Sequence, residues 1–192
     1  MMVSWRRPSS ETIREFLAAQ SKLGLTYTAV GATANLPPDG YRVDHTRINL
    51  GKGEKVFTKA KAALGRWEQF ELGWLEVWPP EPPIEIGEVM AVVAQRLGLW
   101  WLNACRIVYV VDEPTCFGFA YGTLPDHAGT GEERFLVEWD RASDEVWYDI
   151  LAFSRPRLIL AHFGYPYMRW LQKRFGRESA AAMSRVVGHG EG

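Results

Sequence analysis

The residues best suited to chemistry lie close together in the sequence, between residues 123 and 134. His127 is followed there by the adjacent carboxylates Glu132 and Glu133, and then by Arg134. A histidine titrates near neutral pH and can exchange protons with a nearby carboxylate, so this set predicts general acid–base chemistry. If the protein is an enzyme, His127 and Glu133 are the candidate catalytic residues. The alternative interpretation is a surface loop with a salt bridge at the end of a strand.

Strand alternation separates these carboxylates. In an expected strand over 132–139, Glu132 and Arg134 lie on one face, whereas Glu133 points with the apolar residues that follow it. A carboxylate among apolar side chains needs a partner or a raised pKa. Asp149 also needs a partner, because it shares one face of an expected strand over 145–153 with aromatic and aliphatic residues. We expect a structural ion pair there, with Arg106, Arg155 or Arg169 as the partner.

The segment Cys116–Leu124 is the most informative strand. Phe119 and Tyr121 point one way, and Gly118 and Gly122 point the other. Glycine in a strand often marks the close approach of another group. The bare backbone strip therefore predicts either tight packing of a C-terminal helix or the floor of a ligand cavity.

Other site types lack their patterns. The four histidines are scattered and no Cys-x-x-Cys or His-x-x-x-His spacing occurs, so we predict no metal. Gly51-Lys-Gly53 precedes a helix but lacks the Gly-Lys-Ser/Thr ending of a P-loop, and we predict no cofactor. Arg155, in Ser154-Arg-Pro156, can contact a ligand carboxylate.

Composition describes an ordinary globular chain. It has 192 residues, 47% hydrophobic and 23% charged, which predicts one domain. The net charge of −1 makes nucleic acid an unlikely partner, and no apolar stretch is long enough to span a membrane. Two cysteines are too few for a disulfide framework, and the N-terminus lacks the pattern of a signal peptide. We therefore expect reduced thiols and a cytoplasmic protein.

Periodicity predicts the elements that position these residues. Residues 1–24 contain an N-terminal helix, 25–156 form mainly antiparallel strands with one inserted helix at 54–65, and 157–187 are helical. No alternation of strands and helices indicates a parallel sheet. The predicted fold class is α+β: a curved antiparallel sheet packed against a long C-terminal helix.

Several short segments resemble one known family. The segments are Val30-Gly-Ala-Thr33, Leu36-Pro-Pro-Asp-Gly-Tyr41, Leu50-Gly-Lys-Gly53, Gly118-Phe-Ala-Tyr-Gly-Thr-Leu-Pro125, Gly131-Glu-Glu-Arg-Phe135 and Phe153-Ser-Arg-Pro156. They resemble the DUF1990 (UPF0548) family over about Tyr27 to Phe175. That family carries no activity or catalytic residues to transfer. The element order is in turn similar to the helix-grip, START-like or Bet v 1-like fold, which implies an apolar ligand cavity.

Two hypotheses follow. In the first, a small, largely apolar ligand binds between the sheet and the C-terminal helix. In the second, the core is filled, and the protein is a non-catalytic module that meets a protein or nucleic-acid partner. Cavity volume separates them, because ligand pockets are typically about 300–1,000 Å³. The candidate ligand-binding residues are Trp74, Gly118, Tyr121, Gly122, His127, Glu132, Glu133, Arg134, Trp147, Asp149 and Arg155.

Overall fold

The computed structural model describes residues 2–156 and 161–188, without the side chains of 161–166. The elements run from an N-terminal strand and helix, through the sheet, to a long C-terminal helix. They are β1 (Met2–Ser4), α1 (Ser10–Gln20), the 3₁₀ turn η1 (Ala32–Ala34), β2 (Arg42–Lys52), α2 (Glu54–Gly65), η2 (Glu68–Phe70), β3 (Leu75–Trp78), β4 (Val89–Arg96), β5 (Leu99–Glu113), β6 (Cys116–Thr123), β7 (Gly129–Asp140), β8 (Glu145–Pro156) and α3 (Ala161–Gly188).

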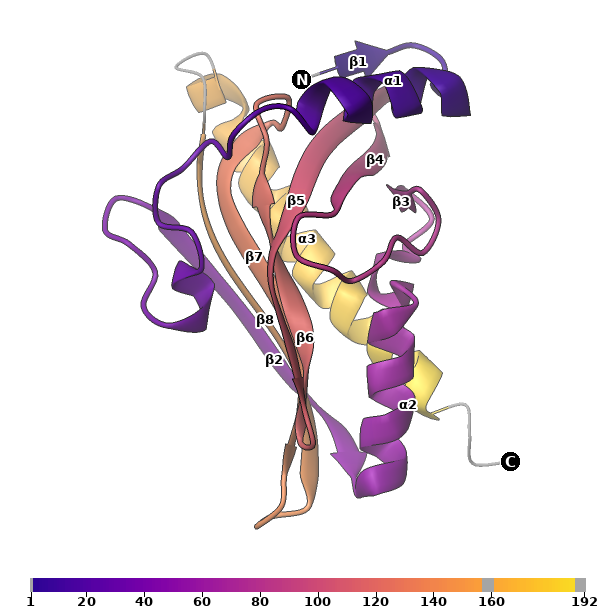
Figure 1. Cartoon of the computed structure of the whole chain (residues 1–192), viewed down its shortest axis with the longest axis vertical. Coiled ribbons are helices and arrows are strands. Elements are labelled where there is room, and N and C mark those ends of the chain that lie inside the picture. Colours follow the sequence, from indigo (N-terminus) through magenta and orange to yellow (C-terminus); the bar gives the residue numbers. More distant parts are fainter. Residues whose placement is uncertain (1, 157–160, 189–192) are drawn as a thin grey trace.

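One curved antiparallel sheet organises the molecule. Its strand order is β2-β8-β7-β6-β5-β4-β3, and β1 pairs with β5. Helices α2 and α3 lie on one side of the sheet, and the segment between α1 and β2 lies on the other (Figure 1). We call these sides the concave face, which carries Tyr121 and Phe135, and the convex face, which carries Glu132 and Asp149. The predicted α+β fold class is confirmed.

Alternation along the strands builds the core beneath the helices. Phe119 and Phe135 are cross-strand partners on the concave face, with ring centroids 5.6 Å apart, and both are fully buried. Phe175 reaches them from α3, with its ring 6.1 Å from that of Phe135. Phe70 from η2 completes the cluster, 5.2 Å from Phe175. Because aromatic side chains bury large areas, this cluster fixes α3 against the sheet.

Helix α1 covers the convex face of the sheet at β4 and β5. Ser9 caps α1 by accepting a hydrogen bond from the Thr12 backbone N–H at 3.1 Å. Ile13 and Leu17 from α1 pack with Val93 of β4. Strand β4 is therefore buried on both faces, as its two-sided apolar pattern predicts.

The structure corrects three element boundaries. Gly98 and Asn103 are typical turn residues and predict a turn over 98–103, but β5 begins at Leu99 because residues 100–102 pair with both β1 and β4. The alternation of Phe70, Leu72 and Trp74 predicts a strand from Phe70, but the strand begins only at Leu75, after η2. The C-terminal helix begins at Ala161, and the predicted positions 157–160 lie outside the described residues. Within the described part of the chain, no helix combines the length and apolarity needed to cross a membrane.

Candidate functional site

A cavity of about 170 Å³ lies between the concave face and α3. Its walls are mainly apolar and come from the sheet, from η2 and from α3. The sheet contributes Val92 and Ile150, and α3 contributes Leu171 and Phe175. Polar residues also line it, and four of them are sequence-predicted site residues: Tyr121, His127, Glu132 and Glu133.

Glu133 is one of three acidic residues that line the cavity, with Asp44 and Glu132. It is the cross-strand partner of Tyr121, whose hydroxyl donates to Glu133 Oε2 at 2.5 Å. Burial raises the pKa of Glu133 to about 7, against the hydrogen bond from Tyr121, which favours the carboxylate. Burial and the nearby carboxylate raise the pKa of Tyr121 well above its ordinary value, so the phenol keeps its proton. Glu133 can therefore gain or lose a proton near neutral pH.

His127 lines the same cavity from the loop between β6 and β7. Gln20 holds this loop by donating to Asp126 Oδ2 at 2.9 Å and accepting from the Asp126 N–H at 3.1 Å. Burial lowers the pKa of His127 to about 4, so its ring is neutral at pH 7. Nδ1 lies 3.0 Å from the Gly129 N and 3.2 Å from the Gly129 carbonyl oxygen. It accepts from the N–H when the ring proton is on Nε2, and it donates to the carbonyl when the proton is on Nδ1. Among the described residues, His127 and Glu133 share no hydrogen bond, so the predicted acid–base pair is in one cavity but not in contact.

Arg96 also lines the cavity, and the sequence analysis did not single it out. It ends β4 on the concave face, in register with Leu99. Its guanidinium lies 4.8 Å from the ring centroid of Trp74. Burial lowers the pKa of Arg96 to about 10, which leaves it charged at neutral pH. The signal that could have found it is alternation, because Arg96 continues the buried row of Met90, Val92 and Ala94.

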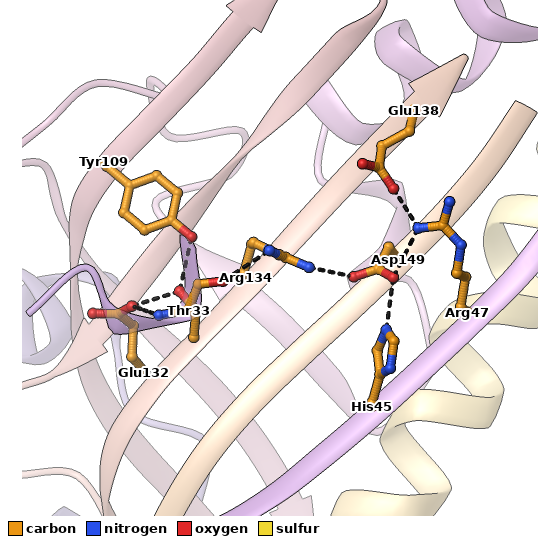
Figure 2. A network of polar contacts seen from close by, with 8 residues as sticks. All are labelled: Thr33, His45, Arg47, Tyr109, Glu132, Arg134, Glu138 and Asp149. Atoms are coloured by element: carbon orange, nitrogen blue, oxygen red, sulfur yellow. Dashed lines mark hydrogen bonds and ion pairs between the residues drawn. The ribbon is translucent and has the colours of Figure 1, made fainter. Parts of the chain in front are cut away.

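The convex face carries a different kind of polar cluster, shown in Figure 2. The Glu132 side chain accepts four hydrogen bonds, from the Tyr27 hydroxyl (2.7 Å), the Gly31 N–H (2.7 Å), and both the N–H (2.9 Å) and the hydroxyl (2.5 Å) of Thr33. Glu132 is therefore the anchor that holds the segment before β2 against the sheet.

Asp149 lies beside this anchor and is linked to it through Arg134 (Figure 2). Arg134 donates to Asp149 Oδ1 and to the Thr33 carbonyl, both at 2.7 Å. His45 and Arg47 contact the other carboxylate oxygen at 2.7 and 3.0 Å. Burial alone would raise the pKa of Asp149, but these three partners outweigh it and lower the pKa. The expected ion pair is present, but its partners are not the predicted Arg106, Arg155 and Arg169.

The glycine strip of β6 faces the convex side, and neither α3 nor a cavity lies against it. A Cβ on Gly122 would stand 2.1 Å from the Tyr27 hydroxyl oxygen. A Cβ on Gly118 would stand 2.0 Å from the Phe135 carbonyl oxygen of the neighbouring strand. The predicted close approach is real, but the approaching groups are Tyr27 and β7.

Three further candidates also lie outside the cavity lining. Trp147 is on the convex face, where it packs under Arg47 at 5.0 Å. Arg155 is exposed and lies over the Tyr41 ring at 4.6 Å. Trp74 is held between Arg96 and Arg174, and its indole N–H donates to Glu178 at 2.6 Å. Side-chain alternation alone does not show which face of a sheet a helix will cover, which is why Trp147 was expected at the cavity.

The sequence of this chain is similar to those of known proteins. Residues 26–182 match the family described as a domain of unknown function, DUF1990. The chain is 33% identical to a UPF0548 protein of Dictyostelium discoideum over 208 residues, which cover 97% of this chain and 96% of the relative. A UPF0548 protein of Deinococcus radiodurans is also 33% identical, over 95% of this chain and 98% of its own length.

Solved structures share the fold at low identity. Norcoclaurine synthase of Thalictrum flavum, in complex with a transition state analogue, aligns over 79% of this chain and 97% of its own with a TM-score of 0.52 and 11% identity. A START superfamily protein of Mycobacterium smegmatis aligns over 78% of this chain and 99% of its own, with a TM-score of 0.50 and 11% identity. These likenesses concern the fold. Since the family match spans most of the chain and the relatives match over nearly their full lengths, the chain belongs to the DUF1990 (UPF0548) family, with a START-like, helix-grip fold.

Proposed function

We propose that the protein binds a small, largely apolar ligand in the cavity between the concave face and α3. The observation that carries this proposal is the cavity itself, in which apolar walls lie beside polar side chains that include Tyr121, His127 and Glu133. Most small-molecule sites have this composition. The fold likeness to a norcoclaurine synthase, whose structure holds a transition state analogue, supports a fold that can bind a small molecule.

The cavity volume limits the size of the ligand. About 170 Å³ is below the range typical of ligand pockets, and this value on its own favours the alternative of an interaction module with a filled core. An engineered cavity of about 150 Å³ lined by Leu, Ile and Phe nevertheless takes up benzene. We therefore propose a ligand of about the size of a single ring.

We also propose that the protein works in a reducing compartment such as the cytoplasm. Cys105 and Cys116 are both free, and Cys105 is fully buried. Burial raises the pKa of both thiols, which makes them poor nucleophiles. These residues therefore support a packing role and suggest no thiol chemistry.

A cavity-filling substitution tests the proposal. Ala152 lines the cavity opposite Glu133, so Ala152→Leu places a branched side chain in the space proposed for the ligand. The control is Ala62→Leu, the same change at an exposed position of α2. We expect ligand-observed NMR to detect phenol and benzene binding to the wild type and to Ala62→Leu, but not to Ala152→Leu.

Two outcomes would contradict the proposal. If none of the three proteins binds either probe, and native mass spectrometry of the purified wild type shows no bound compound, the interaction module becomes the better hypothesis. If Ala152→Leu binds the probes as well as the wild type does, the ligand site is elsewhere on the protein.

A further inference from the structure

Arg96 is a cation at the cavity wall. Among the described residues, its buried Nε has no hydrogen-bond partner and no carboxylate forms an ion pair with it. The carboxylates near it have other partners: Asp44 pairs with Arg169, Glu178 with Arg174, Glu132 accepts from Tyr27 and Thr33, and Glu133 accepts from Tyr121. The ten residues before Tyr167 in the sequence contain no Asp or Glu. A largely desolvated guanidinium without a partner is costly to keep in a fold, which points to an anion that binds there.

The structure also holds the Arg96 side chain in place. Its guanidinium lies 4.8 Å from the centroid of the Trp74 ring, and the guanidinium of Arg174 lies 4.7 Å from the same ring centroid. Trp74 is fixed in turn by its hydrogen bond to Glu178. A preorganised guanidinium loses less conformational entropy when it binds an anion, so this support favours a binding role over a freely moving surface charge.

A second donor lies on the same side of the cavity. The Ala128 N–H donates to Asn103 Oδ1 at 3.2 Å, which brings the loop that carries His127 against β5, the neighbour of β4. The charge of Arg96 contributes to the lowered pKa of His127, so the two groups are within electrostatic reach. In the tautomer in which Nδ1 accepts from the Gly129 N–H, the Nε2–H has no partner among the described residues. A bound anion favours this tautomer, because it makes Nε2–H a neutral hydrogen-bond donor beside a cation.

We propose that the ligand is a small monocarboxylic acid of about one ring in size, whose carboxylate binds Arg96 and the Nε2–H of His127. This inference rests on the proposed function, because it assigns the chemistry of the same cavity. The apolar body of the ligand lies against the walls formed by Val92, Leu171 and Phe175.

Three features favour a monocarboxylate over other anions. The guanidinium fork matches the two oxygens of a planar carboxylate. Arg96 offers one positive charge, which balances one negative charge and not two. The small cavity leaves space for one ring beside a carboxylate, and its apolar walls favour that ring.

Matched probes test the charge. Benzoate and benzamide have nearly the same shape, but only benzoate carries a carboxylate. We expect the wild type to bind benzoate at least about tenfold more tightly than benzamide in isothermal titration or ligand-observed NMR, as one charged hydrogen-bonded contact implies. Arg96→Gln should remove this preference while benzene binding continues, which shows that the variant is folded.

The control is Arg155→Gln, which removes the exposed arginine over Tyr41 and should leave the benzoate preference unchanged. If benzamide binds as tightly as benzoate, or if Arg96→Gln keeps the preference, the carboxylate inference is wrong while the apolar site stands. If no probe binds, benzene included, the proposed function itself fails and this inference fails with it.

Discussion

Two neighbouring residues, Glu132 and Glu133, meet opposite environments on the two faces of one strand. Glu132, on the convex face, accepts four hydrogen bonds and fixes the segment before β2. Glu133, on the concave face, has Tyr121 as its one hydrogen-bond partner, and its pKa is raised to about 7. The residue type is the same, so the partners decide the role. A fully satisfied buried carboxylate stabilises the fold, and an under-satisfied one is available to a ligand or a proton.

The other charged residues on the two faces differ in the same way, in how completely they are paired within the chain. On the convex side, Asp149 is surrounded by His45, Arg47 and Arg134, which neutralise it. On the concave side, Arg96 and His127 each retain an unused donor at the cavity. Charges that are paired within the chain have little left to offer a ligand. We therefore assign structure to the convex face and binding to the concave face.

The largest expected effect is the loss of the convex anchor. Glu132→Ala leaves the buried Tyr27 hydroxyl and the N–H groups of Gly31 and Thr33 without an acceptor, so we expect a loss of about 3–5 kcal/mol in the free energy of unfolding. Glu138→Ala is the control, since its ion pair with Arg47 is partly exposed and should contribute less than about 1 kcal/mol. Urea unfolding measures both. Equal losses of stability in the two variants would mean that Glu132 stabilises the fold no more than the partly exposed Glu138 does.

The glycine strip gives the next effect. Gly122→Ala would place a methyl group 2.1 Å from the Tyr27 hydroxyl oxygen and displace a donor of Glu132. We expect a loss of about 2–3 kcal/mol, as for other overpacked sites. Gly129→Ala is the matched control, because its nearest contact would be an ordinary 3.6 Å. A Gly122→Ala protein as stable as the wild type in thermal unfolding would show that Tyr27 can move without cost.

On the concave face, removing a buried carboxylate should stabilise the protein instead of destabilising it. The pKa of Glu133 is raised to about 7 from its ordinary value near 4.5, so the folded state holds a proton that the unfolded chain releases between those two pH values. Stability therefore falls as pH rises through this window, and the deficit is complete above pH 7. Glu133→Gln removes the deficit, so we expect it to stabilise the protein at pH 8, by roughly 3 kcal/mol at most, and to have little effect at pH 5.

Urea unfolding at the two pH values checks this sign. His127, whose pKa is lowered to about 4, opposes Glu133 by losing stability as pH falls below about 6.5. Its contribution is present in both proteins, so it cancels in the difference between wild type and Glu133→Gln. A variant less stable than the wild type at pH 8 would mean that Glu133 is satisfied in solution.

Much of the fold could be predicted from the sequence, because strand alternation and helix caps are local signals. The helix at 54–65 and the inward direction of Glu133 follow from spacing alone. The identity of distant partners does not. Tyr27 covers Gly122 from 95 positions earlier in the chain, and Arg47 and Arg134 reach Asp149 from neighbouring strands.

The candidate site shows the same division. Alternation places Tyr121 and Glu133 on one face, and both line the cavity. The same rule cannot say whether α3 covers that face or the other, so Trp147 was assigned to the wrong side of the sheet. Arg96 was missed because its significance depends on the absence of an acidic partner, which only the three-dimensional arrangement of the described residues shows.

A matched pair of tyrosine substitutions gives the smallest effect and the sharpest comparison. Tyr27→Phe and Tyr121→Phe each remove one hydroxyl that donates to a buried carboxylate, at 2.7 and 2.5 Å respectively. On the convex face the other donors hold the Glu132 side chain in place, so the lost bond is not replaced, and we expect a cost of about 1–2 kcal/mol. On the concave face Glu133 can respond by keeping its proton, because its pKa rises further without the Tyr121 donor. We therefore expect a cost below about 1 kcal/mol at pH 6, and an upward shift of the Glu133 pKa in a carboxyl-detected NMR titration. Equal costs, with no shift of the Glu133 pKa, would mean that both faces treat their carboxylates alike.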